Sequence, residues 1–201
     1  MKYFEYDSKA IQYLKNVDPI LGQAIDEIGD IKREVTPDLF EGLVSSIIAQ
    51  QISSKAADTV WSRFERLCGP VTPLSVSQTT PESIQAQGMS MRKAKYIHQI
   101  ACLVADGQLD LNALSHENDD TIAKTLKSLP GIGVWTAEML MIFSMQRPDI
   151  VSWDDLAIRR GMMKLYGLDT LDKKTFMHYK QLYSPYGSVA SLYLWAISVR
   201  N

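Results

Sequence analysis

The 201-residue sequence contains little cysteine and histidine, and this scarcity limits the metal sites that it can build. Only two cysteines, Cys68 and Cys102, and three histidines are present. A four-thiolate cluster is therefore excluded, and nothing in the cysteine pattern indicates a secreted, disulfide-linked domain. His98 and Cys102 lie four positions apart on a predicted helix. No third or fourth ligand accompanies them, so we interpret them as ordinary helix residues.

Long apolar runs and an N-terminal export signal are also lacking. The first residues, MKYFEYDSK, contain no apolar segment of the kind that a secretory signal needs. No run elsewhere approaches the length of a membrane span. We therefore expect an intracellular protein with no membrane partner.

The sequence has no excess of basic residues, which bears on nucleic-acid binding. Lys and Arg number 21 against 23 Asp and Glu, for a net charge of −2. Domains that bind nucleic acid indiscriminately are usually basic. A nucleic-acid partner would thus require a locally basic face and phosphate contacts from backbone amides.

Strand signals are nearly absent, since no sustained alternation and no Asn-Gly hairpin occur. Helical periodicity recurs instead, and it predicts an all-α, two-lobed helical bundle with short connections. The predicted helices span residues 8–15, 19–28, 36–50, 53–67, 91–105, 109–114, 121–126, 134–147, 168–183 and 188–199. Thr36 and Thr80 each precede a proline, a pattern typical of an N-cap followed by the first helical residue.

The segment 129–133, LPGIG, predicts a tight turn between two helices. Pro130 cannot lie inside the preceding helix, and two glycines let the backbone adopt positive φ and approach a partner closely. Because a helix begins again at Val134, the amides of Gly131, Gly133 and Val134 should point out of its N-terminus. Such an end binds phosphate through its N–H groups and the positive end of the helix dipole.

Two carboxylates follow one helix later, at Asp154 and Asp155, just before another helical pattern. An anion site with a carboxylate nearby suits a nucleic-acid backbone held beside a reactive centre. The alternative is structural, because Ser152 and Asp155 have the spacing of a capping box.

Taken together, these motifs resemble those of the helix-hairpin-helix (HhH-GPD) DNA glycosylase superfamily, in particular its 3-methyladenine DNA glycosylase II (alkylpurine) branch. The matching features cover roughly residues 36–200. They are the hairpin LPGIG, the following Trp135-Thr136-Ala137, Asp155 twenty positions after Trp135, Trp195, and the upstream segment 48–53, IAQQIS.

The resemblance implies that Asp155 is the catalytic residue. A carboxylate stabilises the oxocarbenium-like transition state of N-glycosidic cleavage and orients the attacking water. Asp154 fits less well, because the family places its aspartate immediately before a Leu-x-x-Arg segment, here Leu156 to Arg159.

The resemblance also assigns the surrounding contacts, each with a structural alternative. Trp135 and Trp195, with Met139 and Tyr193, would line the pocket of the flipped base, although helical tryptophans usually serve the core. The turn residues Gln51, Ile52 and Ser53 would form the wedge that fills the vacated base position, although polar residues at a helix end are usually just solvated. The remaining assignments are Gly131, Gly133, Val134 and Thr136 as DNA-backbone contacts, and the carbonyls of Leu129 and Ile132 as ligands of a monovalent cation (Na or K).

Several whole-chain expectations follow. Bifunctional relatives carry a lysine nucleophile where this chain has Trp135, so we expect a monofunctional glycosylase for 3-methyladenine and related alkylated purines, with no required cofactor.

We expect residues 1–201 to form one glycosylase unit of two lobes, with its active-site cleft between them. One lobe would be built from the middle of the chain, and the other from the termini with the hairpin region. We expect no N-terminal β-rich domain. The partner would be double-stranded DNA with a damaged base, bound by a monomer in the cytoplasm at the nucleoid, or in a eukaryotic nucleus. Two rivals are a non-catalytic hairpin module that binds DNA and a glycosylase for oxidised bases.

Overall fold

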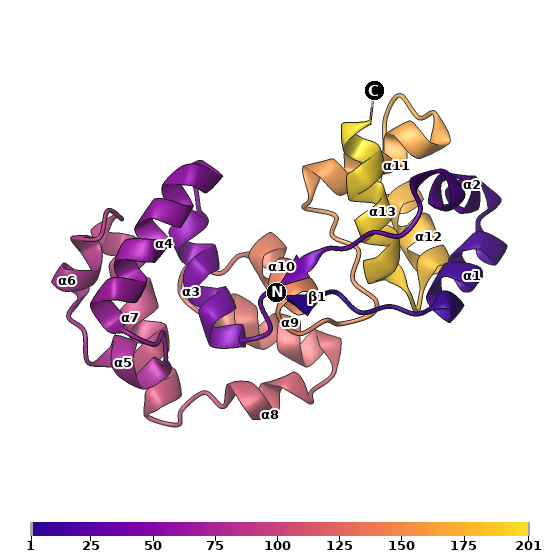
Figure 1. The fold of residues 1–201 in the computed structure, drawn as a ribbon. Coiled ribbons are helices and arrows are strands. Elements are labelled where there is room, and N and C mark those ends of the chain that lie inside the picture. The colour runs from indigo at the N-terminus through magenta and orange to yellow at the C-terminus, as the bar shows by residue number, and fades with distance from the viewer. Residues whose placement is uncertain (1, 201) are drawn as a thin grey trace. The chain divides into compact units, whose positions relative to one another are not determined.

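The computed structural model describes residues 2–200 and confirms the all-α class. Within these residues it contains thirteen helices and one antiparallel pair of short strands, β1 (Lys2–Tyr3) and β2 (Glu34–Val35) (Figure 1). The chain divides into two compact units, one formed by Met1–Val35 with Met141–Asn201 and the other by Thr36–Leu140. None of the helices described is long and apolar enough to cross a bilayer.

The middle unit is organised around α7 (Met91–Ala105), which packs against α3 (Leu39–Ala49) and two short helices, α5 (Pro73–Ser77) and α6 (Pro81–Gln85). The chain reaches α7 from α3 through α4 (Ser54–Cys68), and continues into α8 (Leu111–Ser115) and α9 (Asp119–Ser128). The apolar residues of α3 recur at helical spacing and form a buried face, and its five members are at most 3% exposed: Phe40, Leu43, Val44, Ile47 and Ile48.

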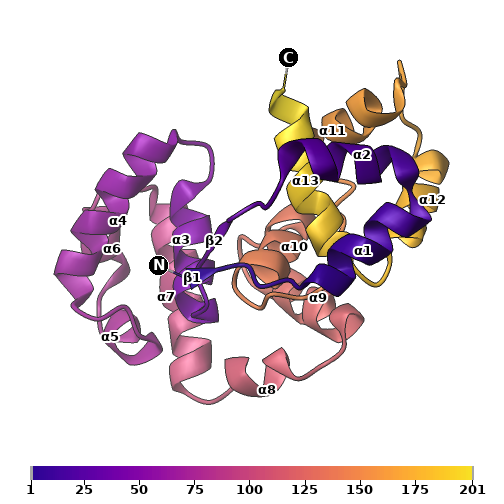
Figure 2. The same cartoon turned by 45° about the vertical axis from the view of Figure 1, so that its right-hand side comes forward.

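The other unit is built around α13 (Gly187–Val199). This helix contacts α1 (Ser8–Val17), α2 (Pro19–Ile28), α11 (Leu156–Tyr166) and α12 (Lys173–Tyr183) (Figure 2). Neighbours on several sides explain why α13 is apolar around most of its circumference. Its approach to α11 is so close that a Cβ at Gly161 would lie 2.0 Å from the carbonyl oxygen of Leu194.

Several helix ends differ from those predicted, because other side chains cap them. The N-cap of α3 is Asp38, whose carboxylate accepts from Glu41 N at 2.9 Å, and not Thr36. Asp172 likewise starts α12 at Lys173, so residues 168–172 lie outside the helix. Thr80 caps α6 as predicted. The connection after α4 holds α5, whose capping box of Thr72 and Ser75 was not anticipated.

The helix after the hairpin, α10 (Val134–Phe143), is shorter than predicted. We expected it to continue to Arg147, but Gln146 adopts a φ of +50°, and Arg147 N donates to the carbonyl of Met141 at 2.8 Å. This left-handed residue, with Pro148 two positions later, prevents the helix from continuing.

We expected the hairpin, residues 129–133, to belong to the lobe formed by the termini. It belongs instead to the middle unit. Two side chains of the middle unit explain this placement. Gln50 Nε2 donates to the Gly131 carbonyl at 2.8 Å, and the Tyr96 ring lies against Gly131.

Candidate functional site

Asp155 is a buried carboxylate at the N-terminus of α11, with 7% of its surface exposed. Its Oδ1 accepts from the amides of Ala157 and Ile158, each at 2.9 Å. The structural alternative, in which Asp155 satisfies a helix end, is therefore confirmed, but Asp155 is itself the N-cap of α11 in place of Ser152. The positive end of the helix dipole also stabilises a negative charge at this position.

Trp195 on α13 also binds this oxygen. Its indole Nε1 donates to Asp155 Oδ1 at 3.2 Å. The ring stacks on Phe143 with a centroid separation of 5.4 Å and an interplanar angle of 30°. On Phe143, in turn, lies the Arg33 guanidinium, 5.2 Å from the ring centroid. The unit thus brings together an arginine, two aromatic rings and the carboxylate.

The hairpin residues have the geometry of a turn that opens a helix. Gly131 has a φ of +83°, and a Cβ there would meet the Tyr96 ring at 2.5 Å. Ile132 N donates to the Leu129 carbonyl at 3.2 Å. At Gly133 the expectation of positive φ is wrong, because only Gly131 adopts it, and no atom lies within 4 Å of a Cβ built on Gly133.

The first turn of α10 presents both exposed and buried side chains. Val134 and Trp135 are 46% and 47% exposed, whereas Thr136 is 8% exposed. The hairpin's Gly133 is exposed as well, and its carbonyl accepts from Ala137 N at 3.0 Å. First-turn amides have no carbonyl partner within their own helix, which makes such an end suitable for an anion.

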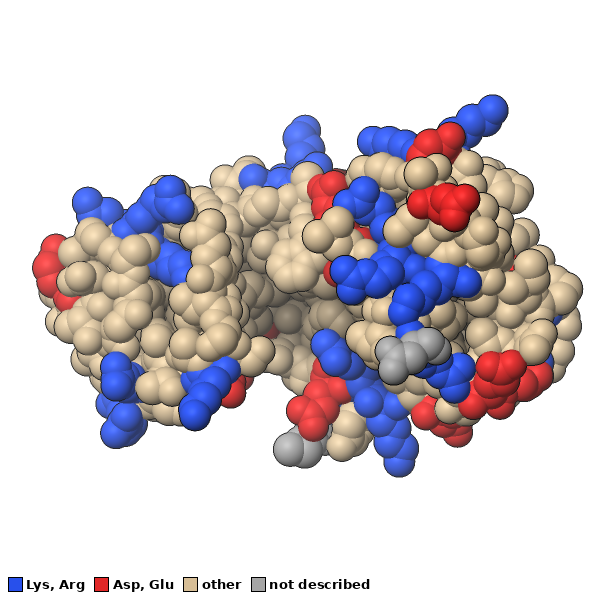
Figure 3. Space-filling view, turned by 90° about the horizontal axis from the view of Figure 1, so that it is seen from above, with Lys and Arg blue, Asp and Glu red and all other residues tan. Residues whose placement is uncertain are grey.

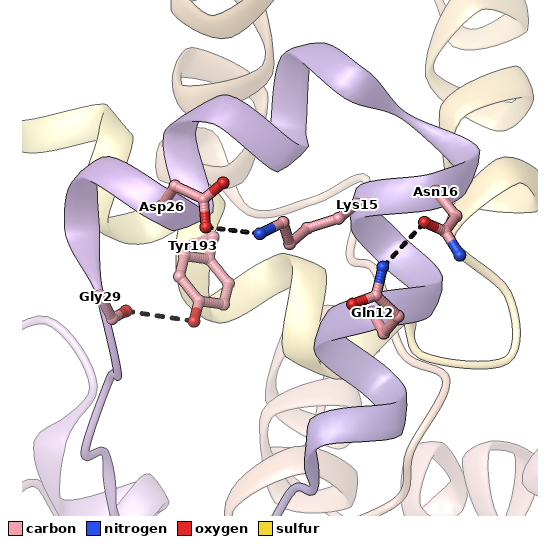
Figure 4. Close-up of polar contacts among 6 residues, drawn as sticks. All are labelled: Gln12, Lys15, Asn16, Asp26, Gly29 and Tyr193. Atoms are coloured by element: carbon pink, nitrogen blue, oxygen red, sulfur yellow. Dashed lines mark hydrogen bonds and ion pairs between the residues drawn. The ribbon is translucent and has the colours of Figure 1, made fainter.

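The four predicted pocket residues divide between the two units. Trp135 and half-buried Met139 belong to the middle unit, and Trp195 and Tyr193 to the other. Tyr193 is 1% exposed, and its hydroxyl donates to the carbonyl of Gly29 at 3.2 Å (Figure 4). Burial raises the pKa of this phenol above its usual range. Its visible role is to hold the end of α2, beside the Lys15–Asp26 ion pair that joins α1 to α2 at 2.6 Å.

The predicted wedge residues form an exposed turn between α3 and α4. Gln51 has a φ of +58°, rare for a residue with a side chain, and Ile52 is 41% exposed. Ser53 is the N-cap of α4 and accepts from Ala56 N at 3.3 Å, so its hydroxyl already has a structural role.

The charged side chains and the possible metal ligands bear on which partners the described residues could bind. On the face drawn in Figure 3, lysine and arginine side chains gather in clusters between uncharged areas, so the net charge of −2 does not preclude locally basic surface. Among residues 2–200, no group of three or more His, Cys, Asp and Glu could hold a metal ion. The Leu129 carbonyl accepts one hydrogen bond, and an oxygen with two lone pairs has further capacity for a cation.

Two side chains of this site carry no sequence signal. Phe143 and Arg33 belong to no motif, and they come together with Trp195 only through tertiary packing. An unbroken apolar pattern around residue 143 is equally consistent with an ordinary core position.

Comparison with known proteins finds similar sequences among DNA repair proteins. The model of a family described as HhH-GPD superfamily base excision DNA repair protein matches residues 44–185. DNA-3-methyladenine glycosylase 1 of Schizosaccharomyces pombe is 30% identical over 164 residues, covering 79% of this chain and 72% of that protein.

Solved structures are similar over nearly the whole chain. A DNA-3-methyladenine glycosidase from Bacillus halodurans superposes with a TM-score of 0.90 at 36% identity, covering 99% of this chain and 93% of the other. The S. pombe 3-methyladenine DNA glycosylase Mag1 in complex with abasic DNA gives a TM-score of 0.79 at 28% identity, covering 94% and 95%.

Proposed function

The chain belongs to the HhH-GPD superfamily of base excision DNA repair proteins, and from this premise we propose that it is a monofunctional DNA glycosylase of the alkylpurine type. It hydrolyses the N-glycosidic bond of 3-methyladenine and related alkylated purines in duplex DNA. The 3-methyladenine glycosylases among its relatives and structural neighbours support this substrate class.

The observation that carries the proposal is the way in which Asp155 is held. A buried carboxylate that accepts from two amides and an indole N–H has a single orientation. Catalysis by electrostatic stabilisation depends on such groups being in place before charge develops. A residue that served only to cap α11 would need the two amides alone.

The proposed chemistry uses this carboxylate against the sugar. As the bond between C1′ and the base nitrogen breaks, positive charge develops on the sugar, and Asp155 stabilises it. Water adds to C1′ and loses a proton, and the base leaves with the bonding electron pair. A cationic alkylpurine leaves as a neutral base, so it needs less assistance than an unmodified purine.

Trp135 supports hydrolysis over lyase chemistry. It occupies the position at which bifunctional relatives carry a lysine, and an indole offers no nucleophilic amine. The product is therefore an intact strand with an abasic site. This also distinguishes the proposal from an oxidised-base glycosylase with lyase activity.

DNA binding completes the proposal. The α10 N-terminus, through Gly133, Val134 and Thr136, binds a DNA phosphate, and a monovalent cation at the Leu129 and Ile132 carbonyls assists it. Trp195, beside Asp155, contacts the extruded base, and the turn at Gln51 and Ile52 fills its place in the duplex. The protein acts as a monomer.

The test is to incubate the protein with three duplexes that are identical except for one purine, which is methylated, oxidised or unmodified. Mass spectrometry of the small-molecule fraction identifies the bases that are released. We expect the methylated purine to be released far faster than the oxidised one. Release of the oxidised purine alone would support the rival glycosylase, and DNA binding with no release would support the non-catalytic module.

A further inference from the structure

The turn after α3 is held to the hairpin by side chains of the middle unit. Lys93 on α7 donates from Nζ to the carbonyls of Ile48 and Gln50, at 2.9 and 2.5 Å. These carbonyls belong to the C-terminal end of α3, where the helix dipole is negative and the last carbonyls have no partner within the helix. Lys93 is half-buried, and burial lowers the pKa of its amine.

The second link runs from the turn to the hairpin. The side chain of Gln50 leaves the end of α3 and donates from Nε2 to the Gly131 carbonyl at 2.8 Å. The Tyr96 ring also lies against Gly131 and leaves no space for a Cβ. Lys93 and Tyr96 lie three apart on α7, so one face of one helix supports both the turn and the hairpin.

This support leaves the tip of the turn exposed and conformationally defined. Gln51 is held at a φ of +58° and Ile52 is 41% exposed, directly after the carbonyl that Lys93 binds. An exposed side chain on a braced turn can enter a base stack without the turn yielding.

We propose that Lys93 and Gln50 are positioning residues that couple the turn to the hairpin, so that a phosphate bound at the hairpin sets how deeply Gln51 and Ile52 enter the duplex. The inference rests on the proposed function. Neither residue contacts the reacting atoms, and their effect is confined to the step in which the damaged base leaves the stack.

The test compares Lys93→Met and Gln50→Met with a matched control, Lys95→Met. Lys95 is exposed on the same helix, and its substitution removes the same charge without touching the turn. Single-turnover excision is measured on one alkylated purine, first paired in a duplex and then in single-stranded DNA, where extrusion is not needed. We expect the duplex rate to fall about tenfold in Gln50→Met, which loses one hydrogen bond, and at least as much in Lys93→Met, which loses two. The single-strand rate should stay near that of the wild type in both variants. Equal losses on the two substrates, or no loss in either variant, would overturn the inference.

A second readout does not depend on excision. In a duplex with 2-aminopurine beside an abasic site, fluorescence rises when the neighbouring stack is opened. At saturating protein we expect a full rise with wild type and Lys95→Met, and a rise of less than half with Lys93→Met and Gln50→Met. Equal signals from all four proteins, or no rise with the wild type, would overturn the inference. Absence of base release by the wild type would instead count against the proposed function.

Discussion

Replacing Trp195 with phenylalanine separates the two roles that this residue has beside Asp155. The substitution removes the indole N–H that donates to Oδ1 at 3.2 Å, but retains a ring that can stack on Phe143. If Trp195 only forms a wall of the base pocket, Trp195→Phe should behave almost as the wild type. If its N–H orients the carboxylate, the chemical step should slow.

The size of the effect follows from that hydrogen bond. A hydrogen bond to a charged group contributes about 1.5–3 kcal/mol, and the separation of 3.2 Å is long for one of this kind, so we take about 1.5 kcal/mol. Lost from the transition state, this free energy lowers the rate about tenfold. The two amides still hold the carboxylate, so unfolding should become easier by at most about 1.5 kcal/mol, a fall in Tm of roughly 3–6 °C.

The assay is single-turnover release of a methylated purine with protein in excess, together with affinity for abasic duplex DNA. We expect a rate about tenfold lower and an affinity within about twofold of the wild type. Trp61→Phe, in the middle unit, measures the general cost of losing an indole. If Trp195→Phe were as fast as Trp61→Phe, or if its rate fell only in proportion to affinity, the hydrogen bond would have no positioning role.

Four further outcomes are expected. Asp155→Asn keeps an oxygen acceptor and a good N-cap, so its Tm should stay near that of the wild type while its rate of excision falls about 10²–10³-fold. Asp154 is exposed, and Asp154→Asn should stay active. The reverse result would exchange the two assignments. Trp135→Ala and Trp195→Ala should slow excision of neutral bases more than of cationic ones, since a neutral leaving group depends more on its pocket; equal losses would indicate structural roles. A Cβ at Gly133 would meet no atom within 4 Å beyond its chain neighbours, so Gly133→Val should keep its Tm and weaken binding to all DNA sequences alike. Unchanged affinity at low salt would exclude the hairpin as phosphate site. Affinity should also fall steeply with added salt because bound phosphates release counterions, and a flat dependence would contradict phosphate binding.

Much of the fold could be predicted because helix periodicity is a local property. The apolar face of α3 is buried as its spacing indicates. The helix ends were less predictable, since several polar residues compete for each cap. Asp38 caps α3, two residues after the predicted N-cap Thr36. Asp172 caps α12, so this helix begins at Lys173 and not at residue 168 as its periodicity suggested.

The candidate site was predictable where a motif encodes it and not where packing alone creates it. The turn at the hairpin follows from its proline and glycines, and the assignment of Asp155 follows from the family resemblance. The structure adds that Asp155 is itself the N-cap. The stack of Arg33 and Phe143 behind Trp195 depends on segments far apart in the chain. Likewise, the spacing of the two hairpin glycines does not reveal that Gly131 adopts positive φ and Gly133 does not. Gly131 is also the glycine that contacts the Tyr96 ring.

The most direct test of the central claim is one intact-mass measurement on both products of a single reaction. A duplex carrying one methylated purine is incubated with the protein, with and without borohydride, and the strands and small molecules are weighed together. The account predicts free methylated purine, a full-length strand that has lost the base and gained a hydroxyl group, and no protein–DNA adduct under borohydride. A cleaved strand with a borohydride-trapped adduct, or a substrate strand of unchanged mass, would contradict it.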